Sequence, residues 1–157
     1  MSEENVEIAR QVFPGSFDMV AVFGDPDVLA AWRQLIEPLV DPDIETVGDP
    51  DYIAMGPGTG VNEGPRGLVA KGVDGFITFW RDWITAWETW SIGEPEFRDI
   101  DADRVLSIYD ARARSKTAQV DMDFHPAHLL TFRDGKVVRA ELFLNRVDAL
   151  KAAGLSE

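Results

Sequence analysis

The sequence predicts an α+β domain in which a curved antiparallel sheet packs against helices. Residues 105–116, 120–132 and 138–145 alternate between apolar and polar side chains, which is typical of strands that bury one face and expose the other. The first third of the chain instead carries apolar residues at helical spacing. Because helices come first and strands follow, the order favours the α+β class.

The size and charge of the chain narrow its expected partners. With 157 residues and a net charge of −13, we expect one acidic domain spanning residues 1–157. Its surface would repel phosphate backbones and anionic lipids, so neither nucleic acid nor a membrane is expected as a partner. The absence of cysteine excludes disulfides and thiolate metal sites. Since the sequence has no basic leader and no run of about eighteen apolar residues, we expect a cytoplasmic protein.

Two helical segments are expected before residue 40. The first spans residues 3–13, is interrupted by Pro14-Gly15 and continues over residues 16–24. Asp25-Pro26-Asp27 then marks a helix start, because Pro is favoured at the first helical position. This second helix would run to about Glu37. Its inward-facing residues are expected to be Leu29, Trp32, Leu35 and Ile36.

The central part of the chain combines a short strand, a long irregular stretch and an aromatic helix. Residues 44–47 are expected to form the strand, and residues 48–67, rich in Gly and Pro, a loop at the rim of the sheet. This loop has no phosphate-binding pattern. Residues 72–90 are expected to be helical, since one helical face would carry Phe76, Phe79, Trp80, Trp83 and Trp87. We interpret these rings mainly as core.

Polar side chains interrupt the buried face of the C-terminal strands at two points. A strand over residues 95–100 and a helix over residues 147–153 flank the alternating segments. On the face that carries apolar residues such as Phe124, the polar exceptions are Tyr109 and His128. A buried polar group needs a hydrogen-bond partner, and a bound ligand can supply it. This pair is therefore the first candidate for a ligand site.

A set of short motifs occurs in order along the chain. They are Asp41-Pro42-Asp43-Ile44, Gly64-Pro65-Arg66-Gly67, Phe79-Trp80-Arg81-Asp82-Trp83, residues 128–139 and Asn145-Arg146. Together they resemble the SnoaL-like branch of the nuclear-transport-factor-2-like superfamily over nearly the whole chain. The resemblance implies a cone, in which a bent antiparallel sheet is closed by three helices around a pocket, and a homodimer. The superfamily includes polyketide cyclases, ketosteroid isomerases, dehydratases and epoxide hydrolases, and also binding proteins without catalysis.

The resemblance implies roles for particular residues. His128 matches the strand position where the isomerases hold the acid that donates to the substrate oxyanion, and Tyr109 faces the same way on the neighbouring strand. Asp49 follows the first strand, where the isomerases have their base. These three are the candidate catalytic residues. The candidate substrate-binding residues are Phe17, Trp80, Trp83, Ala111, Phe124, Leu130, Leu142 and Leu144.

The chain also departs from each activity of the family. The final strand has Leu142 where the cyclases and the epoxide hydrolase need an acid, and Phe17 lies near the position of the isomerases' phenol donor. No complete acid/base set of a known member is therefore present. With two histidines and no metal-ligand spacing, neither a metal nor a cofactor is expected.

Several of these residues also have a structural interpretation. His128 can be a buried histidine that bonds locally, and Tyr109 a core tyrosine. A bulge at Pro126 or on the last strand would turn His125 or Glu141 inward instead. On the outer face, charged residues are expected to form cross-strand ion pairs or a dimer surface: Arg112, Arg114, Asp121 and Asp123.

Three functions are consistent with the sequence, and in the first two a small apolar molecule is the expected partner. The first is a cofactor-independent isomerase, cyclase or dehydratase, with His128 as general acid/base and Tyr109 orienting an oxygen. It requires a cavity on the order of several hundred Å³. The second is a binding protein with the same cavity and no proton chemistry. The third is a dimerisation module whose mouth is filled by its own side chains.

Overall fold

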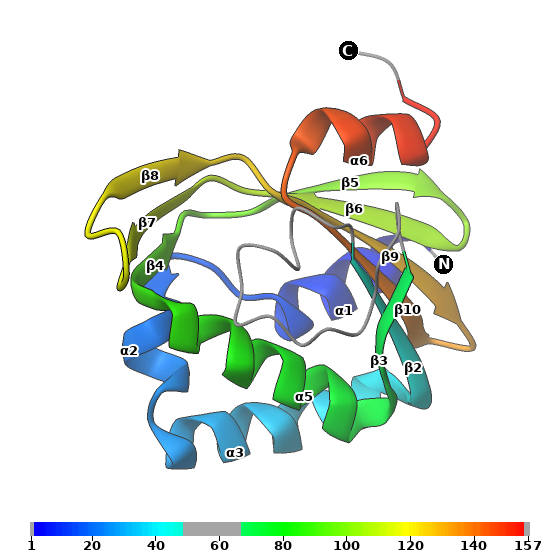
Figure 1. Cartoon of the computed structure of the whole chain (residues 1–157). Coiled ribbons are helices and arrows are strands. Elements are labelled where there is room, and N and C mark those ends of the chain that lie inside the picture. Colours follow the sequence, from blue (N-terminus) through cyan, green and yellow to red (C-terminus); the bar gives the residue numbers. More distant parts are fainter. Residues whose placement is uncertain (1, 49–66, 156–157) are drawn as a thin grey trace.

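In the computed structural model, which describes residues 2–48 and 67–155, a strongly bent sheet encloses the N-terminal and central helices (Figure 1). The enclosed helices are α1 (Ser2–Val12), α2 (Met19–Phe23), α3 (Pro26–Ile36) and α5 (Gly72–Trp83). Helix α6 (Arg146–Ala152) lies on the other side of the sheet. Short 3₁₀ turns follow α3 (Glu37–Leu39) and α5 (Ile84–Ala86). The predicted α+β class, with a curved antiparallel sheet over helices, is confirmed.

The strands divide into a small and a large sheet. The small sheet has the order β1-β4-β7-β8, formed by β1 (Phe17–Asp18), β4 (Trp87–Ile92), β7 (Ala111–Ser115) and β8 (Asp121–Phe124). The large sheet has the order β3-β2-β10-β9-β6-β5, formed by β3 (Gly67–Lys71), β2 (Val40–Gly48), β10 (Lys136–Phe143), β9 (Ala127–Arg133), β6 (Arg104–Ile108) and β5 (Glu96–Asp101). Neighbouring strands are antiparallel except β2 and β10, which are parallel.

Helix α3 begins where its sequence signal predicts, whereas the helix expected over residues 16–24 begins only at Met19, because Phe17–Asp18 pairs with β4 as a strand. The Asp25 side chain accepts a hydrogen bond from the Asp27 amide at 2.9 Å, with Pro26 as the first residue of α3. Asp18 caps α2 in the same way, and Asn145 caps α6. Each of these side chains satisfies an amide that a helix start leaves without a partner. No helix in the described ranges is long and apolar enough to cross a membrane.

The two sheets diverge where two predicted strands are broken. The expected strand over residues 105–116 is divided by Tyr109-Asp110, and the strand over residues 120–132 by His125-Pro126. The Tyr109 amide still donates to the carbonyl of Pro126, at 3.4 Å. Both strand segments therefore pass from one sheet to the other at neighbouring positions, and the whole sheet bends there.

Other element boundaries differ from the sequence prediction. The helix expected over residues 72–90 ends at Trp83, and Trp87–Ile92 forms β4 instead. This segment has two Trp, one Thr and one Ile, which favour strands, and it pairs with β7. A register shift between Trp87 and Thr89 lets both Trp87 and Trp90 face the core. The strand expected at residues 44–47 begins at Val40, and residues 67–71 form β3, which was not predicted.

The core lies in the bend of the sheet and is dominated by aromatic side chains. Trp80, Trp83, Trp87 and Trp90 are each at most 2% exposed, and burial of one such ring stabilises the fold by roughly 2–3 kcal/mol. Leu35, which was expected to face inward, is 51% exposed. Trp32 and Ile36 of the same predicted set are buried as expected, because their side of α3 faces the core. A smaller cluster lies under α6 on the outer side.

Residues 13–17, which we name the strap, cross the open side of the sheet between α1 and β1. Ser16 has a φ of 64°, in the left-handed region that non-glycine residues rarely adopt. Its amide donates to the Gly93 carbonyl at 3.3 Å, and its hydroxyl bonds the Glu94 carboxylate at 2.9 Å. Gly15 lies against the Pro95 ring, so closely that a Cβ would collide with it. The strap is therefore held against the loop that follows β4.

We predict that Gly15→Ala destabilises the protein by about 1–3 kcal/mol. The new Cβ would lie 2.7 Å from the Gly93 carbonyl oxygen and would also overlap the Pro95 ring, so the strap has to move. Gly93→Ala is the matched control, since the nearest atom to its Cβ is the Asp110 carbonyl oxygen at an ordinary 3.7 Å. Urea unfolding measures both variants. Equal stabilities for the two would contradict the close packing of the strap.

Candidate functional site

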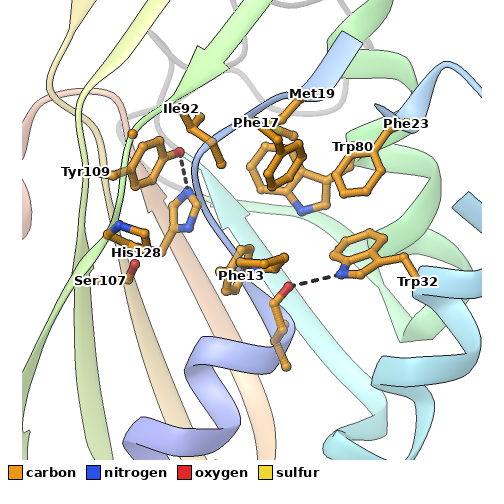
Figure 2. A pocket seen from close by; sticks show the side chains of 14 residues that line it. Phe13, Phe17, Met19, Phe23, Trp32, Trp80, Ile92, Ser107, Tyr109 and His128 are labelled. Atoms are coloured by element: carbon orange, nitrogen blue, oxygen red, sulfur yellow. Dashed lines mark hydrogen bonds between the residues drawn. The ribbon is translucent and has the colours of Figure 1, made fainter. Parts of the chain in front are cut away.

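A small cavity lies between the strap and the inner face of the large sheet (Figure 2). Its sheet side is formed by Ser107, Tyr109 and His128. Its helix side is aromatic and comes from the strap and the enclosed helices: Phe13, Phe17, Phe23, Trp32 and Trp80. The volume is about 30 Å³. That is room for a water molecule but not for an aromatic ring, since a cavity that binds benzene measures about 150 Å³.

The sheet side of the cavity carries a hydrogen-bonded pair. The phenol oxygen of Tyr109 lies 3.0 Å from Nε2 of His128, and Figure 2 shows this bond at the edge of the cavity. Tyr109 is 5% exposed and His128 2% exposed. His128 is the second residue of β9, and Tyr109 lies at the break after β6. The bend of the sheet therefore brings the two side chains together, as their shared inward face predicted.

Burial lowers the pKa of His128 from 6.5 to about 3. The imidazole is thus neutral at ordinary pH, with one nitrogen that donates and one that accepts. Nδ1 has no hydrogen-bond partner among the residues that the structure describes. A neutral ring with an unpartnered nitrogen can accept a proton from a ligand or donate a hydrogen bond to it.

Sequence reasoning missed Ser107 as a site residue. It is fully buried, it lines the cavity, and its hydroxyl lacks a partner within the described part of the chain. Ser107 lies directly opposite His128 in the pairing of β6 with β9. The available signal was its odd position in the strand, because the inward set of that strand is otherwise apolar except for Tyr109.

Phe13 covers the histidine from the helix side. The centres of the two rings are 4.6 Å apart. Trp80 lies behind them, with its ring centre 5.6 Å from that of His128. Trp32 stacks on Phe23 and donates its indole N–H to the Val12 carbonyl at 3.1 Å. The helix wall is thus a packed layer of rings, in which Phe13 is only half buried.

The structure brings some of the predicted site residues together and separates others. Tyr109, His128, Phe17 and Trp80 line the cavity. The other predicted binding residues are not among its lining residues: Trp83, Ala111, Phe124, Leu130, Leu142 and Leu144. They lie in or against the core instead, as where Phe124 stacks on Trp90. Asp49 lies outside the described residues.

The register of the last strand leaves no acid at the cavity. A bulge between Val137 and Arg139 shifts the pairing of β10, yet Leu142 is fully buried. Glu141 lies 3.8 Å from Arg139 in an ion pair on the other face. His125 also points outward, where its Nδ1 bonds Asp110 at 2.8 Å. Among residues 2–48 and 67–155, no group of three or more His, Asp and Glu side chains could hold a metal ion.

We predict that buried His128 makes the protein lose stability as the pH falls from about 6.5 toward 3. The unfolded chain takes up a proton on this residue near 6.5 and the folded chain only near 3, so the unfolded state binds more protons between these values. The free-energy difference between wild type and His128→Gln should therefore change by roughly 1 kcal/mol per pH unit in this window.

Urea unfolding at several pH values between 4 and 8, on the order of one unit apart, measures this difference. His125→Gln is the control, because His125 is exposed. The assignment to His128 fails if His128→Gln keeps the acid sensitivity of the wild type, or if His125→Gln removes it.

Comparisons with known proteins reveal relatives in structure but not in sequence. No family model matches the chain, and no curated protein matches it in sequence. A candidate SnoaL-like polyketide cyclase from Jannaschia sp. CCS1 has a TM-score of 0.63 at 14% identity, covering 99% of this chain and 95% of that one. A nuclear-transport-factor-2-like protein of unknown function from Burkholderia pseudomallei K96243 has a TM-score of 0.62 at 17% identity, covering 94% and 95%.

A third similar structure contains a small molecule. It is TerC co-crystallised with polyporic acid, with a TM-score of 0.59, 20% identity, and coverage of 96% of this chain and 98% of that chain. At such identities the likeness concerns the fold alone. The chain has the nuclear-transport-factor-2-like fold, in the form that SnoaL-like proteins share.

Proposed function

We propose that this protein binds a small, mostly apolar molecule in the cavity beside Tyr109 and His128. The observation that carries the proposal is a buried, hydrogen-bonded pair of polar side chains set in a mostly apolar cavity. Buried polar groups with an unused hydrogen-bonding atom are costly without a partner. A cavity that is mainly apolar with a few convergent polar groups is also the usual form of a ligand site.

A ligand must displace the Phe13 side chain, because the present volume of about 30 Å³ is too small for a ring. Phe13 is half buried and belongs to the strap, and its ring lies directly on His128. An aromatic ligand that took its place would make the same ring contacts. The proposed ligand-bound state is therefore one in which the strap has moved and the ligand covers the histidine.

The chemistry proposed for the site is proton transfer by His128, with Tyr109 orienting an oxygen of the ligand. In the closed cavity burial keeps the imidazole neutral, with a pKa of about 3, so it becomes an effective base only when a bound ligand or entering water raises that pKa toward neutral. No carboxylate lines the described cavity, so an isomerase or cyclase reaction would need Asp49 as its second group. Without that group the same site is a binding site only. The small molecule bound in TerC and the cyclase and isomerase descriptions of other similar structures support this class of ligand.

We predict that Phe13→Ala increases the affinity for an uncharged aromatic probe, N-phenyl-1-naphthylamine, by about tenfold or more. Removing the phenyl ring enlarges the cavity by roughly the volume of one ring, so the phenyl group of the probe no longer has to displace it. Fluorescence titration measures the affinity. Phe97→Ala is the matched control. Phe97, on β5, is also half buried, but its ring packs under Arg10 and does not line the cavity. Equal probe affinities for wild type and Phe13→Ala would contradict the proposed site, as would an equal gain in Phe97→Ala.

A second candidate function is a dimerisation module without a ligand. The specific observation in its favour is the small cavity, which the protein's own Phe13 fills. The candidate surface is the outer face of the small sheet, where Arg112 pairs with Asp123 at 3.2 Å and Arg114 with Asp121 at 3.0 Å. Exposed ion pairs of this kind add only tenths of a kcal/mol to the stability of the fold. Their side chains can therefore re-pair with those of a second copy at little cost.

If that face is the dimer surface, wild type sediments as a dimer and Arg112→Glu as a monomer. The reversed charge would place like charges across the interface. Arg98→Glu on β5 is the control, since Arg98 is also exposed and pairs with Glu96. Sedimentation velocity measures the mass. A monomeric wild type, or a dimer that withstands the Arg112 substitution, argues against this surface.

A further inference from the structure

We infer that Ser107 and Nδ1 of His128 form a second polar point in the cavity, which receives one uncharged oxygen of an aromatic hydroxy or oxo compound. This inference rests on the proposed function and names the class of ligand that the site selects. It makes Ser107 the residue that distinguishes an oxygenated ring from a plain hydrocarbon ring.

The two polar atoms come from side chains that face each other across a strand pair. Ser107 of β6 and His128 of β9 are direct partners in the register, so their Cβ atoms are about 5 Å apart on the same face of the sheet. Ser107 is 0% exposed and His128 2% exposed, and both line the cavity. One ligand oxygen between them can bond both atoms.

Neither atom has a hydrogen-bond partner in the described part of the chain. The bond to Tyr109 uses the other ring nitrogen of His128, Nε2. The polar point formed by Ser107 and Nδ1 is therefore distinct from that bond. Each unpartnered group has lost its water without replacing it. A ligand hydroxyl would restore both bonds, whereas a methyl group in the same place would restore neither.

The chemistry of the pair favours an oxygen over a nitrogen donor. If the Tyr109 hydroxyl donates to Nε2, the proton of the neutral ring is on Nδ1 and points to the ligand. If Nε2 donates to Tyr109, Nδ1 accepts, and the Ser107 hydroxyl remains free to donate. In both arrangements at least one donor faces the ligand, and a hydroxyl or carbonyl oxygen satisfies it.

The ligand is uncharged because none of the described lining residues carries an ionised side chain. The cavity is lined by aromatic and aliphatic groups, prolines and the three polar residues already named. A carboxylate placed there would lose its water without gaining a cation. His128 itself is neutral and resists protonation in this environment.

The test compares toluene, phenol and benzoate at pH 7 on wild type, Ser107→Ala and Thr46→Val. Toluene matches the Phe13 side chain in size, phenol adds one oxygen, and benzoate adds a charge. Thr46 is the matched control because its hydroxyl is also fully buried and lacks a partner in the described residues, but it does not line the cavity. Quenching of tryptophan fluorescence reports binding, since Trp32 and Trp80 line the site.

We expect wild type and Thr46→Val to bind phenol about fivefold more tightly than toluene, the ratio that one neutral hydrogen bond supplies. Benzoate should bind at least about tenfold more weakly than phenol. Ser107→Ala should reduce this preference to about twofold or less, because only Nδ1 of His128 then remains to bond the oxygen. Its unfolding midpoint should match or exceed that of wild type, because a hydroxyl without a partner contributes no stability.

The inference is overturned, with the proposed function intact, if wild type binds toluene as tightly as phenol. It is also overturned if Ser107→Ala keeps the preference for phenol, or if it unfolds more easily, since the hydroxyl would then have a structural partner. If benzoate binds more tightly than phenol, the site selects an anion and the inference of an uncharged ligand is wrong. If none of the three probes and no N-phenyl-1-naphthylamine binds wild type or Phe13→Ala, the proposed function and this inference both fall.

Discussion

The bend of the sheet at Tyr109-Asp110 and Pro126 is the constraint on which the rest of the structure depends. Arg146 at the start of α6 holds this point, because its guanidinium donates to the Tyr109 carbonyl at 3.0 Å and to Asp110 at 2.9 Å. His125 and Arg146 together lower the pKa of the Asp110 carboxyl, so this carboxylate stays ionised. Arg146 and Asp110 lie on the outer face of the sheet, yet their contacts fix the Tyr109 backbone, whose side chain bonds His128 on the inner face. Tyr109 thus links the ion pairs on the outer face of the sheet to the geometry of the cavity on its inner face.

The interior of the bend is closed by the protein's own aromatic side chains. Trp83, Trp87 and Trp90 fill the part under the small sheet, where Ala111 and Ala113 leave room for them. Beside Tyr109 and His128 a cavity of about 30 Å³ remains. The strap, with Phe13, decides whether that space can grow. The tryptophan layer is packed on all sides, whereas Phe13 is only partly buried and belongs to a short connecting segment.

Much of the fold and part of the site were predictable from local patterns. Alternation placed Tyr109 and His128 on one buried face, and the structure joins them by a hydrogen bond. Capping signals such as Asp25-Pro26 located α3. The prediction was wrong where a local pattern had two solutions. Residues 87–90 continue a helical face as well as they fit a strand, and only pairing with β7 decides between these. Leu35 fits an apolar stripe, but no element among the described residues buries it, and it is 51% exposed.

The sequence by itself determined the fold class and which face of each strand is buried, because both follow from the period of apolar residues along the chain. Only the tertiary structure decided which of the buried groups meet. The cross-strand register set Ser107 opposite His128, and the strap set Phe13 on the imidazole. Most of the expected pocket residues became core instead, since packing of the tryptophans closed the space around them. Such contacts join residues far apart in the chain, and no local period encodes them.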